Sequence, residues 1–109
     1  MSIVEGELED LRIGWPDARA MSEGGYSYVH LPVLKIPHDN AIIIREALFC
    51  PQQRDGYPNR LFLSEPVAGR GGNWIAHRIL DKTWHTWSWN YVPAGRLTVM
   101  LAQHVAALR

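Results

Sequence analysis

The sequence predicts an α+β domain in which a small antiparallel sheet packs against a C-terminal helix. Two observations predict this fold class. Short segments rich in β-branched and aromatic residues alternate with turns that contain proline and glycine. Near the end of the chain, apolar residues recur at positions 97, 101, 105 and 108, which is the spacing of one helical face. The length of 109 residues fits one domain, 1–109.

The first quarter of the chain gives the weakest structural signals. Residues 1–13 carry little helical periodicity. Residues 14–25 contain Pro16 and the Gly24-Gly25 pair, which favour a loop. We therefore expect residues 1–25 to form a poorly defined segment ahead of the sheet.

The middle of the chain predicts about three or four strands. Residues 26–37 begin with strand-forming side chains, but Pro32 and Pro37 should limit that strand or place it at an edge. Residues 41–51 give the clearest strand, because three isoleucines open it and a proline closes it. Residues 60–67 alternate apolar and other side chains, which predicts another short strand.

The last third combines glycines, tryptophans and a helix. Residues 68–73 contain three glycines and should be flexible. Residues 84–90, WHTWSWN, are expected to form an irregular loop. The helix is predicted over residues 96–108, with His104 as a half-buried structural histidine at the edge of its apolar face.

The overall charge balance and its distribution along the chain indicate which classes of partner to expect. Lys plus Arg and Asp plus Glu both number 11, and this balance argues against a dedicated nucleic-acid-binding protein. Residues 1–23 are mostly acidic among their charged positions, whereas residues 66–109 are mostly basic. This polarity suits docking onto a charged protein partner. Two ordinary solvated faces explain it equally well.

Cysteine content and hydropathy indicate the compartment. Cys50 is the single cysteine, so no internal disulfide and no cysteine-rich metal site can form. His77, His85 and Cys50 lack the spacing of zinc ligands. The first residues lack the pattern of a signal peptide, and no apolar run is long enough to span a bilayer. We expect a cytoplasmic protein without a membrane, metal or cofactor requirement.

A set of motifs follows the strand order predicted above. Phe49-Cys50-Pro51 leads into the turn Gly56-Tyr57-Pro58 and the strand 61–64. The segment Trp84-His85-Thr86-Trp87-Ser88 then precedes Val92-Pro93 and the terminal helix. Over residues 26–108 this arrangement resembles the ubiquitin-conjugating (UBC) superfamily. The Trp-x-x-Trp-Ser element looks closest to a bacterial branch that is often called family E.

The resemblance implies a fold and a pathway. It implies a UBC-like meander of antiparallel strands with a C-terminal packing helix. It also implies two partners, a ubiquitin-like protein and its activating enzyme. Members of this branch occur in bacterial conjugation operons, which implies a transferase role and a place in antiphage defence.

One departure from the family concerns the reactive residue. Family members carry their substrate on a cysteine of the long loop, but this chain has no cysteine from 51 to 109. Cys50 lies before the Tyr-Pro turn and is expected to be inert core. A hydroxyl would then have to form an oxyester with the ubiquitin-like protein.

Residues 84–90, the Trp-rich segment, and nearby residues supply the groups that such a reaction needs. The match to the Trp-x-x-Trp-Ser element makes Ser88 the first candidate for the nucleophile. Spacing from Val92-Pro93 in family members favours Thr83, and Thr86 lies between the two. His85, or alternatively His77, would be the base, and Asn90 would be an oxyanion donor.

Other interpretations remain open at this point. An inactive UBC-like scaffold that binds the same partners fits as well as the carrier does. The tryptophans could also simply pack the segment against the helix, since each ring can bury roughly 150–250 Å². A third class is an aromatic binding module for sugars or single-stranded nucleic acid.

Overall fold

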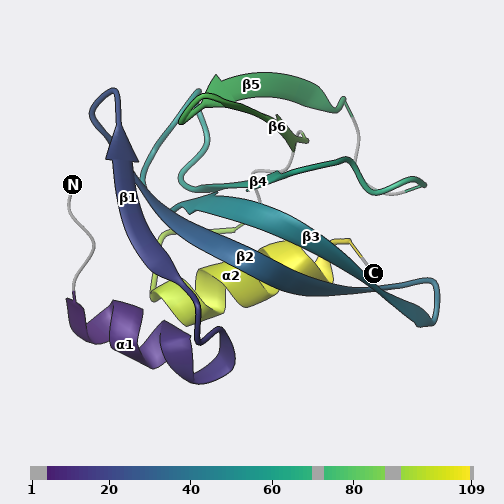
Figure 1. Cartoon of the computed structure of the whole chain (residues 1–109), viewed down its shortest axis with the longest axis horizontal. Coiled ribbons are helices and arrows are strands. Elements are labelled where there is room, and N and C mark those ends of the chain that lie inside the picture. Colours follow the sequence, from purple (N-terminus) through teal and green to yellow (C-terminus); the bar gives the residue numbers. More distant parts are fainter. Residues whose placement is uncertain (1–4, 70–72, 88–91, 109) are drawn as a thin grey trace.

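The computed structural model describes residues 5–69, 73–87 and 92–108. In these residues the fold is α+β, with two helices and a six-stranded antiparallel sheet in the order β1-β2-β3-β4-β6-β5 (Figure 1). The elements are α1 (Glu5–Gly14), β1 (Arg19–Glu23), β2 (Tyr26–His38), β3 (Ala41–Cys50), β4 (Arg60–Leu63), β5 (Ile75–Ile79), β6 (Lys82–Thr86) and α2 (Leu97–Ala106). The prediction of an antiparallel sheet with a C-terminal helix is confirmed, but three or four strands was too few.

The N-terminal segment is more regular than its sequence predicted. Helix α1 buries Leu8 and Leu11, which lie three residues apart on one face, and it has acids in its first turn and Arg12 in its last. Strand β1 follows, and the pair Gly24-Gly25, both at positive φ, turns it into β2. The loop predicted over residues 14–25 was therefore wrong for β1.

Strand β2 runs through both of its prolines. It pairs with β1 from Tyr26 to His30 and with β3 along most of its length. Its register with β3 shifts between Leu31 and Leu34, so the Pro32 region forms a bulge and needs no ladder hydrogen bond. Both prolines lie beyond His30, where β2 has no strand on the β1 side in the described chain, so the prediction that they place the strand at an edge holds there. The prediction that they limit the strand was wrong, because β2 continues to His38.

Strand β4 confirms the strand predicted over residues 60–67, although it is shorter, and it is buried on both faces. All four of its residues are buried. Leu61 and Leu63 belong to the core cluster that contains the helices, whereas Phe62 belongs to a second cluster on the other face. Two apolar layers therefore meet on this one strand.

Strands β5 and β6 form a hairpin that the sequence did not predict. Leu80 and Asp81 make its turn at φ 53° and 61°, without a glycine. In the described residues β6 pairs with β4 at one position, Leu63 opposite His85. The hairpin bends over the second cluster, while both helices pack on the first (Figure 1).

Helix α2 buries Leu97, Met100, Leu101 and His104. Leu108 just beyond the helix is also fully buried, so the predicted apolar face is confirmed. His104 is only 1% exposed, so the prediction that it is half-buried was wrong. Neither helix of the described chain is long and apolar enough to cross a membrane.

Candidate functional site

The predicted reactive segment begins as a regular strand. Thr83, His85 and Thr86 lie on β6, so the irregular loop expected from residue 84 was wrong up to Thr86. Ser88 and Asn90 lie outside the described residues. The described part of the site therefore consists of β6, its neighbours, and the elements that the two tryptophans contact.

Thr86 is held in a structural role. Its side chain is 1% exposed, and its hydroxyl donates a hydrogen bond of 2.8 Å to the carbonyl oxygen of Leu61 on β4. An attacking hydroxyl must reach solvent-borne substrate and give its proton to a base. Thr86 meets neither requirement in this conformation.

Thr83 and His85 share one face of β6. They are two residues apart in a strand, where alternate side chains point the same way. Thr83 is exposed and His85 is half-buried, with Leu63 and Ala76 as its cross-strand neighbours. Two positions along a strand span about 7 Å, so one water could bridge a hydroxyl and an imidazole at these sites.

His77 lies on the other face of the hairpin. It pairs with Trp84, and its ring lies 5.5 Å from Phe62 in an edge-to-face arrangement. Burial, together with the nearby Arg60, lowers the pKa of His77, and its buried Nε2 has no hydrogen-bond partner in the described residues. His77 and His85 therefore cannot act on the same group.

The two described tryptophans of the segment pack in different cores. Trp84 and Trp87 are each 2% exposed, Trp84 in the second cluster and Trp87 in the first. The Trp84 indole N–H donates to the Ile79 carbonyl at 3.0 Å, and Trp87 packs against Trp74 in a tilted arrangement with 5.0 Å between ring centroids. The interpretation that at least two of the tryptophans pack the core is confirmed, so these two rings form no exposed aromatic platform.

Cys50 is fully buried in the second cluster. Burial raises the pKa of its thiol, whose Sγ lies 3.6 Å from the Gln52 carbonyl oxygen. Thiolate chemistry at this residue is disfavoured, because only the thiolate is nucleophilic. Among the described residues, no group of three or more His, Cys, Asp and Glu side chains is placed to hold a metal.

Two arginines beside the Tyr-Pro turn were missed by the sequence analysis. The turn closes with reciprocal 2.9 Å hydrogen bonds between Arg54 and Tyr57, and Asp55 bridges the guanidinium groups of Arg54 and Arg60 at 3.3 and 3.1 Å. Arg60 is 3% exposed and lies 4.1 Å from the Tyr57 ring centroid. Burial lowers the pKa of Arg60, and the aromatic contacts offset part of the cost of burying its charge.

A second missed cluster ties the hairpin to the sheet. Glu46 on β3 accepts hydrogen bonds from His30, at 2.7 Å, and from Lys82 on β6. Burial acts to raise the pKa of Glu46, but the hydrogen bonds from Lys82 and His30 outweigh it and lower the pKa. The Lys82 ammonium also lies 4.9 Å from the Trp84 ring centroid. No local sequence pattern brings these three strands together.

Residues around α2 fix the far end of the Trp-rich segment. The Asn59 side chain donates to the carbonyl of Val92 at 2.9 Å, and its Oδ1 lies 2.5 Å from Nε2 of His104. All three residues are buried. This chain of contacts links the start of β4, helix α2 and the residue that follows the undescribed stretch 88–91.

Comparison with protein families, with curated proteins and with solved structures gave no match.

Proposed function

We propose that this chain is a UBC-like domain that binds a ubiquitin-like protein and its activating enzyme, and that it carries the former as an oxyester. The observation that carries the proposal is the order of the elements. Strands β1 to β4 form a meander, the turn containing Tyr57-Pro58 connects β3 to β4, and the Trp-rich segment leads to α2.

The proposed reaction transfers an activated C-terminal acyl group to a hydroxyl. The hydroxyl oxygen attacks the acyl carbon, a C–O ester bond forms, and the bond to the leaving group of the activating enzyme breaks. An imidazole accepts the hydroxyl proton, directly or through water. Ser88 remains the first nucleophile because of its signature position. Among the described hydroxyls, exposed Thr83 beside His85 is favoured over Thr86.

An inactive scaffold is the second candidate, and the state of Cys50 favours it. The sole cysteine is buried and its thiol pKa is raised. It is therefore poorly suited to carry the substrate as the loop cysteine of family members does. A scaffold would keep the partner surfaces and lose the transfer. The carrier and the scaffold differ in one observable, a covalent adduct.

The experiment mixes this protein with a candidate ubiquitin-like protein and a candidate activating enzyme from neighbouring genes, adds ATP, and follows adduct mass. A carrier forms an adduct that survives thiol reductants and is cleaved by hydroxylamine or mild base. Ser88→Ala should abolish it, and Cys50→Ala should not. Ser88→Cys tests the position further, because a thioester there would become sensitive to thiols.

Each outcome assigns a role. An adduct that persists in Ser88→Ala but disappears in Thr83→Val would identify Thr83, on β6, as the nucleophile. No adduct with a demonstrably active activating enzyme supports the scaffold. Absence of both partner genes near this one would count against the carrier and the scaffold together.

A further inference from the structure

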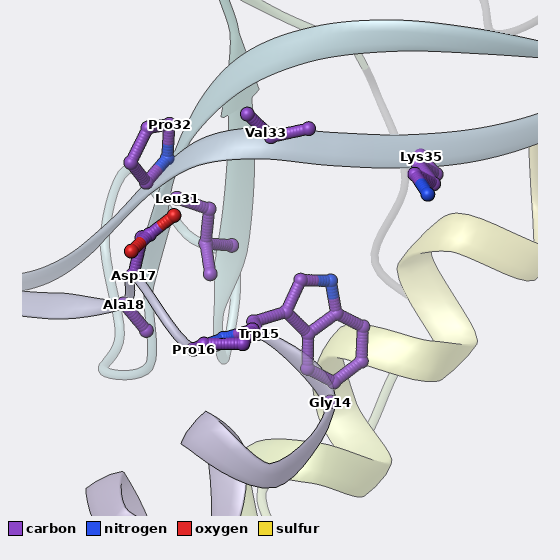
Figure 2. Close-up of a pocket in the computed structure, with 9 residues that line it drawn as sticks. All are labelled: Gly14, Trp15, Pro16, Asp17, Ala18, Leu31, Pro32, Val33 and Lys35. Atoms are coloured by element: carbon purple, nitrogen blue, oxygen red, sulfur yellow. The ribbon is translucent and has the colours of Figure 1, made fainter.

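A pocket lies between the turn that follows α1 and strand β2, away from the Trp-rich segment (Figure 2). Its cavity is about 460 Å³, within the range of about 300–1,000 Å³ that is typical of small-molecule sites. The side chains that matter for its chemistry are Trp15, Asp17, Leu31, Pro32, Val33 and Lys35.

Apolar side chains make up much of the pocket. Trp15 is partly buried against the first core cluster and borders the pocket with its indole ring. Leu31 and Val33 also line the pocket, and Leu31 is buried, whereas Val33 is 50% exposed. A flat aromatic ring beside aliphatic side chains suits an aliphatic side chain of a ligand.

Two opposite charges flank this apolar surface. Figure 2 shows Asp17 and Lys35 on either side of the Trp15 ring. Both side chains are exposed, and neither has a hydrogen bond or an ion pair with another described residue. The carboxylate and the ammonium are therefore available to a ligand that carries the complementary charges.

Part of the β2 backbone beside the pocket lacks strand partners in the described chain. Strand β1 covers β2 only as far as His30, so β2 has no strand on that side from Leu31 onward in the described chain. The register shift between Leu31 and Leu34 also releases the Pro32 region from pairing with β3. Pro32 has a backbone carbonyl but no N–H, so this residue can accept a hydrogen bond from a ligand but cannot donate one.

We propose that this pocket binds a short zwitterionic peptide with an apolar side chain, of about dipeptide size. Its ammonium group lies at Asp17, its aliphatic side chain packs on Trp15, and its carboxylate lies at Lys35. The site is independent of the proposed conjugation function. For a ligand of this size at an open site, we expect a Kd on the order of 0.1–1 mM.

The test uses leucyl-leucine as the probe and two capped forms of it, one N-acetylated and one C-amidated. Binding is followed by two-dimensional NMR of the full chain, with the Trp15 indole N–H and the Val33 amide as reporters. Acetylation should weaken binding to wild type by about 2- to 5-fold, as expected for the loss of one exposed ion pair. Amidation should have a similar effect.

Two variants turn this into a double-mutant cycle. Asp17→Asn should weaken leucyl-leucine binding by the same factor and should no longer discriminate against the acetylated form. Lys35→Gln should also weaken leucyl-leucine binding by this factor, and it should no longer discriminate between the free and the C-amidated peptide. Asp10→Asn removes an exposed carboxylate of α1 that does not line the pocket, and it should bind like wild type.

Three results would overturn the proposal. The first is no movement of the Trp15 and Val33 signals up to about 10 mM leucyl-leucine, a concentration well above the expected Kd. The second is equal affinity of wild type for the free and capped peptides. The third is discrimination between them that persists unchanged in Asp17→Asn and Lys35→Gln.

Discussion

Acid should destabilise this fold through His104. The imidazole ring is 1% exposed and lies between Phe49, at 5.6 Å, and Trp87, at 6.1 Å between ring centroids. Its Nε2 donates to Oδ1 of Asn59, so this nitrogen carries the proton of the neutral ring, and Nδ1 is buried with no hydrogen-bond partner among the described residues. A second proton would place a charge in the apolar core. Burial accordingly lowers the pKa of His104 from 6.5 to about 4.

The direction of the pH effect follows from the two pKa values. The unfolded chain takes up the proton near pH 6.5, whereas the folded chain takes it up only near pH 4, so stability falls as pH falls between these values. Above pH 6.5 both states are neutral at this residue and the effect is absent. At about 1.4 kcal/mol per pKa unit, the full loss of unfolding free energy is about 3 kcal/mol.

The variant His104→Gln isolates this contribution. Glutamine can still donate to Asn59 but does not titrate. Urea unfolding of both proteins at about pH 7 and about pH 4.5 gives the change in unfolding free energy with pH. Wild type should lose roughly 2–3 kcal/mol more than the variant over this interval. Parallel pH profiles for the two proteins would refute the reasoning.

Three further predictions concern the core and the candidate site. Leu101→Asp should destabilise the fold by more than about 4 kcal/mol, because Leu101 is fully buried and the new charge has no partner. Thermal melting identical to that of wild type would show that α2 is not part of the core. Thr86→Val should cost about 1 kcal/mol in urea unfolding, because the Leu61 carbonyl loses its donor; an unchanged midpoint would mean that this hydrogen bond contributes nothing. Cys50 should resist alkylation by iodoacetamide in the native protein and react after unfolding, because its thiol is buried with a raised pKa; rapid native labelling would contradict the burial.

The elements predicted well are those whose pattern is local and strong. The helix expected over residues 96–108 is observed as Leu97–Ala106, and the strand expected over 41–51 is Ala41–Cys50. An apolar face at helical spacing and a run of isoleucines each specify one conformation with little help from distant residues.

The elements missed depend on tertiary partners. The burial pattern of β1 shows no buried position, so its strand character comes from pairing with β2. Hairpin β5–β6 turns at Leu80-Asp81 without the glycine or asparagine that usually marks such a turn. Helix α1 buries only two leucines and is stabilised by packing rather than by its own propensity.

The site was predictable only in part, for the same reason. Once residues 82–86 are known to be a strand, the three-residue spacing of Trp84 and Trp87 accounts for their burial on opposite faces. The hydrogen bond that occupies Thr86 depends on β4, more than twenty residues away in sequence. The pocket between Asp17 and Lys35 likewise requires the turn after α1 to meet β2, which no local pattern encodes.

Binding to the proposed partners tests the central claim most directly. The measurement is association of this chain with a candidate ubiquitin-like protein and a candidate activating enzyme from neighbouring genes, followed by pull-down across a salt series. We predict association at low salt that weakens as salt rises, because acidic residues dominate the charged positions of 1–23 and basic residues those of 66–109. No association with either protein at low salt would contradict both the carrier and the scaffold.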